Sequence, residues 1–388
     1  MSKSIITKTI MEWLKSNIVY LTKAGSQAYG LANDFSDLDV RGIYVPPRYV
    51  ENNLFHKFEQ VENPPCVEEM YGHLRNPKNP KFDSSVYSLR KFFVLAADTN
   101  PNIIELLWTN EEDHLVCGSL MKELISYRHK FLSSKAKFTF SGYAFAQAAK
   151  IERHRKWIVL GEVTEPKRED FGLPPVAARG VDEVFGYIKS KVEEWNLNQF
   201  PLEEKDRADL KETIWELVWT LCQKEVSWDN WPDAYAQGVI HNLGKELSLK
   251  DEVVDLIHKE RFYFKAVNNY KSWLRWKAER NPARRALEEK FGMDCKHASH
   301  LVRLMRMGHE IMTQGKVIVK RPDREELLSI KNGGWSYEQV MAYAKEMQVK
   351  LDEAYKVTTL PKSVDHAKLN ELYHWLTEEY HTIPERMD

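Results

Sequence analysis

The hydrophobic pattern of the chain changes at about residue 115, and this change restricts the folds open to it. Before that point, short segments alternate apolar and polar residues, which is the period of a half-buried β-strand. After it, apolar residues recur at the three- and four-residue spacing of amphipathic helices. The segments with helical spacing are 119–132, 139–160, 182–196, 207–225, 249–279, 295–314 and 336–357. The pattern predicts an α+β protein with a small mixed sheet near the N-terminus and a large helical region after it.

The length of the chain and its loop-forming residues suggest how these parts are organised. A chain of 388 residues is long enough for two or three domains of about 100–200 residues each. We expect an α/β domain over 1–115, opened by a helix from about Ser4 to Ser16, and a helical domain over 116–388. Prolines, glycines and charges at 161–181 indicate a loop, and the helical domain is expected to carry an inserted subregion at about 155–290.

The composition is that of a globular protein without a strong overall electrostatic field. Lys and Arg number 56 against 57 Asp and Glu, for a net charge of -1, so a nucleic-acid partner would need a local basic patch. The four cysteines form no CxxC pair, which argues against a zinc ribbon or a disulfide framework. The chain lacks a signal-peptide pattern and any run of about 18 apolar residues. These features predict a cytoplasmic protein with no membrane partner.

Two carboxylates share one face of a predicted strand. Successive side chains on a strand point to opposite faces, so Asp37 and Asp39 point one way while Leu38 and Val40 pack into the core. Two neighbouring carboxylates repel each other unless a cation lies between them, and Mg²⁺ (or Mn²⁺) prefers such oxygen ligands. Arg41 continues the same face and could contact a phosphate. A lone Asp-x-Asp pair is weak evidence, since many such pairs are simply solvated.

A glycine-serine pair precedes these carboxylates. Gly25 and Ser26 end a predicted strand and begin a short turn or helix, where free backbone N–H groups and a missing β-carbon allow close approach of a triphosphate. The Ser26 hydroxyl can add a contact. Phosphate donors on one side and metal ligands on the other are the arrangement that two-metal phosphoryl or nucleotidyl transfer requires.

The compound pattern, Gly-Ser-x-Ala-Tyr-Gly at 25–30 followed by Ser-Asp-x-Asp-x-Arg-Gly at 36–42, resembles the DNA polymerase β-like nucleotidyltransferases. In its extended form it is similar to the predicted nucleotidyltransferases associated with RNA repair in bacteria and phages. Further segments that resemble this family are the YSLRKF stretch after Asp83, Asn100 to Glu105, 131–147, 293–306 and 315–333. The stretch 155–290 resembles it least.

The resemblance implies a catalytic domain over 1–115 that moves a nucleoside monophosphate from an NTP to an acceptor hydroxyl, with release of pyrophosphate. It implies an RNA end as the acceptor and a third carboxylate that completes the metal site and acts as base. Asp83 is the candidate, with Glu59 and Glu62 as alternatives. An aspartate before a helical run is equally often an N-cap, so this assignment has a structural rival.

Several cationic residues are candidates for nucleotide contacts. Lys296, His300 and Arg303 lie on one predicted helix, and Lys135 belongs to a segment that resembles the family. His297 and His300 could form a zinc pair, but the sequence shows no third ligand at a suitable spacing. The basic runs at 152–157 and 320–324 suit a phosphate backbone, although such runs are usually solvated helix faces.

Two other functions compete with RNA modification. A protein-modifying enzyme would place AMP or UMP on a Ser, Thr or Tyr of a partner, and labelling of a proteome would distinguish it from RNA extension. A non-catalytic nucleotide sensor would keep the pocket alone. The intact pair Asp37 and Asp39 argues against the sensor, because an inactive site has no need to hold two like charges together.

Overall fold

The computed structural model describes residues 13–161, 163–173, 202–222, 251–279 and 282–382, with a few isolated positions between 186 and 245. The chain divides into two compact units, Met1–Ile158 with Ala286–Asp388 and Val159–Arg285. Of the expected first helix, residues 13–17 are helical and the rest lies outside the described residues. The expected helix at 182–196 lies largely outside them as well.

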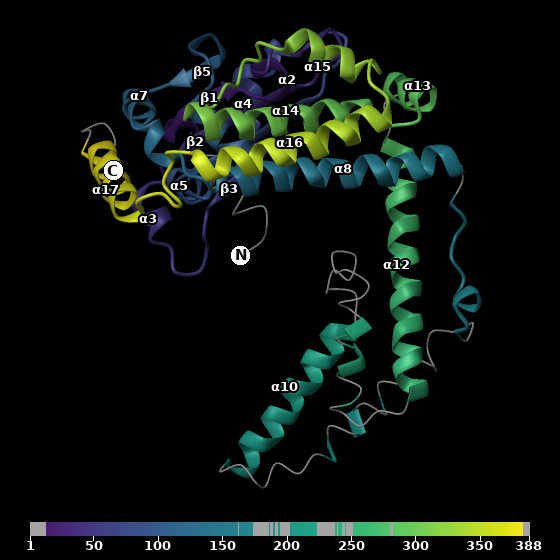
Figure 1. Ribbon diagram of the computed structural model, residues 1–388. Helices are drawn as coiled ribbons and strands as arrows, with labels where there is room; N and C mark the ends of the chain where they lie inside the picture. Colours follow the sequence, from purple (N-terminus) through teal and green to yellow (C-terminus); the bar gives the residue numbers. More distant parts are fainter. Residues whose placement is uncertain are drawn as a thin grey trace. The chain divides into compact units, whose positions relative to one another are not determined.

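A five-stranded sheet forms the centre of the first unit (Figure 1). Its strands are β1 (Ile18–Lys23), β2 (Leu38–Tyr44), β3 (Gln60–Glu62), β4 (Phe82–Ser88) and β5 (His114–Cys117). They lie in the order β3-β4-β2-β1-β5. The β2 and β4 strands are parallel and the other pairs are antiparallel, so the sheet is mixed. Together with the helices that follow, it confirms the predicted α+β class.

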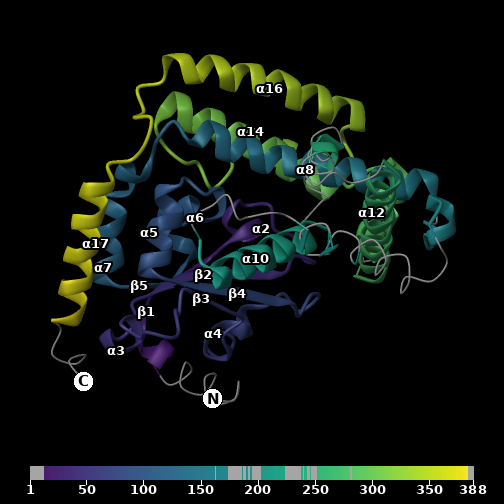
Figure 2. The same ribbon diagram turned by 90° about the horizontal axis from the view of Figure 1, so that it is seen from below.

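The sheet has a hydrophobic core on each face, as the alternation in β2 requires. Leu38, Val40 and Tyr44 pack on one face with Val50 and Val67. The elements covering that face are α3 (Arg48–Glu51) and α4 (Pro65–Tyr71). The other face packs against α5 (Leu89–Ala97), α6 (Pro101–Ile104) and α7 (Ser119–Ser126). Figure 2 shows α4 and α5 on opposite sides of the sheet.

Long helices lie beyond α5 and α6 on the second face and share its core. They are α8 (Ala136–Leu160), α14 (Cys295–Gln314) and α16 (Tyr337–Val357), and they lie side by side in both views. Gly308 of α14 allows close packing, because a β-carbon there would lie 2.9 Å from Cβ of Phe140 in α8. The remaining helices of this unit are α2 (Gly25–Ala28), α15 (Arg324–Lys331) and α17 (His366–His381), with α13 (Pro282–Phe291) at its border.

The second unit is helical where it is described. It contains the 3₁₀ turn η5 (Arg168–Phe171) and the helices α10 (Glu204–Cys222) and α12 (Asp251–Glu279). The buried guanidinium of Arg168 pairs with Glu260, which joins η5 to α12. Among the described helices, none has both the length and the apolar composition needed to cross a bilayer.

Candidate active site

Three carboxylates meet at the start of two neighbouring strands. Asp39 in β2 and Asp83 in β4 are Cα partners in the parallel ladder, and Asp37 directly precedes β2. Leu38 and Val40 are buried on the opposite face, so the aspartates face away from that core. Residues 44 positions apart in the chain are thereby brought to one site.

Burial and the surrounding charges together shift the pKa of Asp39. Burial raises the pKa of this carboxyl above its usual value, and repulsion from Asp37 and Asp83 raises it further, while Arg41 and Lys296 oppose the shift. A half-buried carboxylate beside two others is a site where a divalent cation would relieve both repulsion and desolvation. The donor set is entirely oxygen, which fits Mg²⁺ or Mn²⁺.

Arg41 is engaged with Asp83. Its Nη2 donates to Oδ2 of Asp83 at 3.0 Å, and its Nη1 donates to the backbone oxygens of Val40 and Asp83. The Asp83 carboxylate raises the pKa of the guanidinium, although burial opposes this. The side chain expected to contact a phosphate therefore holds the orientation of the third carboxylate in this structure.

The alternative third carboxylates have other partners. Glu59 pairs with Lys91 at 2.8 Å, and Glu62 lies on the edge strand β3, where it accepts a hydrogen bond from Ser85. The helix after β4 is capped by Ser88, so Asp83 is not its N-cap. By position, Asp83 is the partner of Asp39.

Gly25 lies directly against the carboxylate of Asp39. Its φ is +57°, and a β-carbon there would lie 2.3 Å from Oδ2 of Asp39. Only glycine satisfies both conditions. The neighbouring Ser26 has a buried hydroxyl oxygen with no hydrogen-bond partner among the described residues. An unsatisfied hydroxyl at this point is available to a ligand.

Two lysines from the C-terminal helices bring positive charge to the carboxylates. Lys296 in the first turn of α14 lowers the pKa of Asp39. Lys331, the last residue of α15, donates to the backbone oxygen of Leu31 at 3.2 Å. Burial and the nearby charge of Lys296 lower the pKa of Lys331, whereas Asp37 raises it. A triphosphate would compensate this pair of neighbouring cations.

Arg303, by contrast, is buried in a structural cluster. Its guanidinium carbon lies 3.7 Å from the ring centre of Tyr29, and its Nη1 lies 3.6 Å from Oε2 of Glu105. The Tyr29 hydroxyl donates to the same carboxylate, with 2.7 and 2.9 Å to its two oxygens. Burial raises the pKa of Glu105 and the Arg303 charge lowers it. This cluster connects α14 to the loop that follows Gly25.

His300 is held neutral. Burial lowers the pKa of its imidazole well below the usual range, and the charges of Arg303 and Lys296 lower it further. It can therefore donate one hydrogen bond and accept another, but it adds no positive charge to that of Lys296 and Lys331 at neutral pH.

The other cationic candidates have partners away from the carboxylates. Lys135, before α8, pairs with Asp98 at 3.1 Å. In the run at 320–324, Arg321 is buried and pairs with Glu310 and Asp323. Arg324 donates to the backbone oxygen of Gly30. This run thus helps to attach the C-terminal region to the loop after α2, and in the run at 152–157 Arg155 pairs with Glu338.

The sequence analysis assigned no role to three residues around the site, namely Lys331 and the two partners of Arg303, Tyr29 and Glu105. All three lie within segments that carry the family resemblance, namely 25–30, 100–105 and 315–333, so the sequence holds a signal for them. Lys331 ends an ordinary amphipathic helix, and nothing in its spacing distinguishes it from a solvated lysine.

Comparison with known proteins relates the segment that carries the carboxylates to a described family. Residues 4–158 match a family model described as RlaP, RNA repair pathway DNA polymerase beta family. The uncharacterized 38.9 kDa protein in the nrdC-mobD intergenic region of Enterobacteria phage T4 is 31% identical over 135 residues, which span 32% of this chain and 36% of that protein. The uncharacterized protein YcgL of Bacillus subtilis (strain 168) is 27% identical over 199 residues, 51% of this chain and 68% of that protein. No solved structure matches the chain.

Proposed function

Because residues 4–158 match the model of the RNA repair pathway DNA polymerase beta family, we propose that the chain is a metal-dependent nucleotidyltransferase. It moves a nucleoside monophosphate from an NTP to an acceptor hydroxyl and releases pyrophosphate. This match supports nucleotidyl transfer in general, and the metal, the acceptor and the residue roles are our proposal.

The observation that carries the proposal is the pairing of Asp39 with Asp83 on parallel strands, with Asp37 beside them. These three residues would hold Mg²⁺ or Mn²⁺. A bound divalent cation neutralises the charge that builds up on the transferred phosphoryl group and on the leaving pyrophosphate. Arg41 keeps the Asp83 carboxylate in place, from where it accepts the proton of the attacking hydroxyl.

The triphosphate would bind beside the carboxylates. Ser26 offers its unpartnered hydroxyl, and Gly25 leaves room for the Asp39 carboxylate beside the loop. Lys296 and Lys331 supply positive charge to the phosphates, and the neutral imidazole of His300 offers a hydrogen bond. The chain therefore acts mainly by positioning and by charge compensation.

The acceptor in our proposal is an RNA end, which follows the family description and not a contact in the structure. Incubation with each α-labelled NTP, Mg²⁺ or Mn²⁺, and separate pools of RNA, DNA and protein tests this directly. Label on RNA supports the full proposal. Label on protein keeps the transfer chemistry but replaces the acceptor. Absence of label in every pool, at saturating metal and with folded protein, overturns the proposal.

A further inference from the structure

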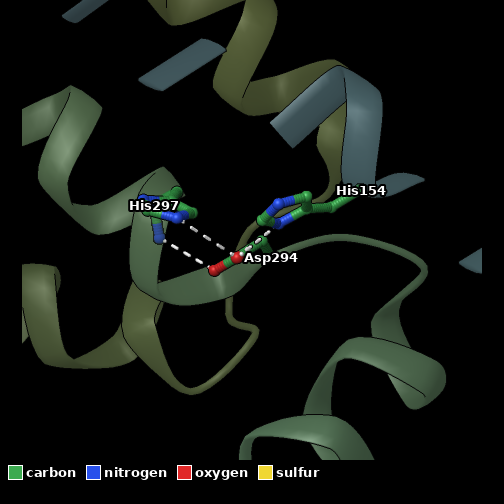
Figure 3. A group of neighbouring side chains, drawn as sticks. All are labelled: His154, Asp294 and His297. Carbon is green, nitrogen blue, oxygen red and sulfur yellow. Dashed lines mark hydrogen bonds and ion pairs between the residues drawn. The ribbon is translucent and has the colours of Figure 1, made fainter. Parts of the chain in front are cut away.

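A second group of metal-binding side chains lies between α8 and α14 (Figure 3). His154 comes from the last two turns of α8, Asp294 is the N-cap of α14, and His297 lies in its first turn. Nδ1 of His154 is 2.9 Å and Nε2 of His297 is 3.5 Å from the same oxygen, Oδ2 of Asp294. The three donor atoms all lie within 4.8 Å of one another.

Only one of the two carboxylate oxygens of Asp294 takes part in capping the helix. Its Oδ1 accepts a hydrogen bond from the backbone N–H of His297 at 3.1 Å, as an N-cap requires. Its Oδ2 faces the two imidazoles and takes no part in that cap. The side chain is fully buried, with 0% exposed, so its charge is costly unless a nearby cation compensates it.

We propose that Nδ1 of His154, Oδ2 of Asp294 and Nε2 of His297 bind one divalent transition-metal ion, with zinc as the expected occupant. Two imidazoles and a carboxylate are a common zinc donor set, in which water takes the fourth position. Tetrahedral bonds of about 2.0–2.2 Å place neighbouring donor atoms about 3.4 Å apart. The two distances to Oδ2 of Asp294, 2.9 and 3.5 Å, lie on either side of that value, and the two imidazole nitrogens lie within 4.8 Å of each other. Mg²⁺, which prefers oxygen ligands, suits this group poorly.

This site differs from the histidine pair that the sequence suggested. His297 is joined by Asp294, three residues before it, and by His154 of α8, which lies 143 positions earlier in the chain than His297. The ring of His300 lies 6.3 Å from that of His297 and perpendicular to it, and His300 is not one of the three ligands. Zinc would fasten the first turn of α14 to α8. Lys296, adjacent to His297, would then be held in its position near Asp39.

Zinc binding to metal-free protein, prepared without a polyhistidine tag, tests the proposal. Titration against a chromogenic chelator in excess Mg²⁺ keeps the carboxylate site occupied and measures only the tighter site. We expect one Zn²⁺ per chain and visible d–d bands typical of tetrahedral geometry when Co²⁺ replaces it. His154→Gln and His297→Gln should each weaken binding by more than the roughly 10–100-fold that changes to outer-shell groups cause.

Two further variants keep the test decisive. His309→Gln lies on the same helix α14, outside the cluster, and should bind zinc like the wild type. Asp294→Asn keeps an N-cap side chain of the same shape but removes the charge, so it should fold and lose zinc affinity. A wild-type protein that retains no zinc overturns the proposal. Equal zinc affinity in wild type and in folded Asp294→Asn and His154→Gln variants also overturns it, and leaves a purely hydrogen-bonded cluster.

The indole of Trp157 provides an independent signal. It stacks on the ring of His154, with ring centroids 5.3 Å apart and planes inclined by 23°. A paramagnetic ion such as Co²⁺ bound at the cluster should quench its fluorescence. Trp157→Phe should lose that component of the quenching while still binding one Zn²⁺. Quenching that is identical in the two proteins would place the bound ion elsewhere and contradict the proposal.

Discussion

At the scale of single residues, Asp39 is the carboxylate on which most interactions of the candidate active site converge. It faces Asp83 across the parallel ladder, lies two residues from Asp37, and fills the space left by the missing β-carbon of Gly25. Its pKa is raised because burial and like charges both disfavour ionisation. In the metal-free protein the ionised Asp39 carboxylate therefore lowers the stability of the fold, and a bound divalent cation would remove this destabilisation.

Asp39→Asn should abolish transfer and stabilise the metal-free fold. The native state keeps this proton to a higher pH than the unfolded chain, so wild-type stability falls as pH rises from the usual value of 3.8 through the raised pKa. The variant lacks this loss and should melt at a higher temperature at pH 7 without metal. Activity should drop at least about 100-fold, as when one electrostatic group is removed from a transition state. Melting curves with and without Mg²⁺, beside labelled transfer, measure both effects.

Gly25→Ala should impair the site more than the fold, and Gly30→Ala is its matched control. Both glycines have positive φ, +57° and +71°, so each alanine costs about 1–3 kcal/mol of backbone strain. Only at position 25 does the added carbon collide with Asp39, since the nearest atom at position 30 is 3.9 Å away. We expect the two variants to melt at similar temperatures and only Gly25→Ala to lose Mn²⁺ binding. Equal Mn²⁺ binding in the two variants would show that the carboxylate is not displaced.

At the scale of elements, α14 presents two kinds of positive charge along one face. Lys296 is partly exposed beside the carboxylates, whereas Arg303 is buried against Tyr29 and Glu105. Their helical spacing predicts a shared face, but it does not distinguish a ligand-binding lysine from an arginine that holds two segments together. That distinction depends on residues contributed from distant parts of the chain.

Replacing these two residues separately should give opposite results. Lys296→Ala removes a charge that a phosphate would meet, so NTP affinity should fall about 10-fold or more with little change in melting temperature. Arg303→Ala leaves Glu105 buried without its cation and should cost about 3–5 kcal/mol of stability. Calorimetry with a non-hydrolysable NTP and thermal melting of the same samples separate the two effects. Loss of affinity without loss of stability in Arg303→Ala would make that residue a direct phosphate ligand.

The sequence predicts individual elements better than their partners. The alternation from Asp37 to Arg41 predicts β2 and the side on which its carboxylates lie, because side-chain direction on a strand is a local property. The proximity of Asp83 depends on which strands pair and in which register, and no local pattern specifies that. For the same reason no local pattern predicts the contact of His154 in α8 with Asp294 at the start of α14.

At the scale of the whole molecule, the unit that carries the site is built from two separate stretches of chain. Residues 4–158 match the family model, yet their core is completed by residues after 286. Phe140 of α8, Met305 of α14 and Leu351 of α16 are fully buried in one cluster. The cationic residues Lys296 and Lys331 also come from the second stretch. The matched segment thus holds the carboxylates but only part of the fold around them.

Removing Val159–Arg285 should therefore be tolerated, whereas isolating residues 1–158 should not. The contact between His154 and Asp294 shows that the two stretches approach each other near the excised segment, so a Gly/Ser linker of about twelve residues, which reaches up to about 40 Å, can join them. The fragment 1–158 exposes the core face of α8. Each large apolar side chain left in water loses about 1.5–3 kcal/mol of the stabilisation that its burial would provide. We expect a single cooperative melt and retained Mn²⁺ and NTP binding from the linked chain, and no cooperative melt from the fragment. If the fragment melts cooperatively and binds Mn²⁺, the C-terminal helices are dispensable for the site. If the linked chain fails to fold, residues 159–285 contribute to the stability of the first unit.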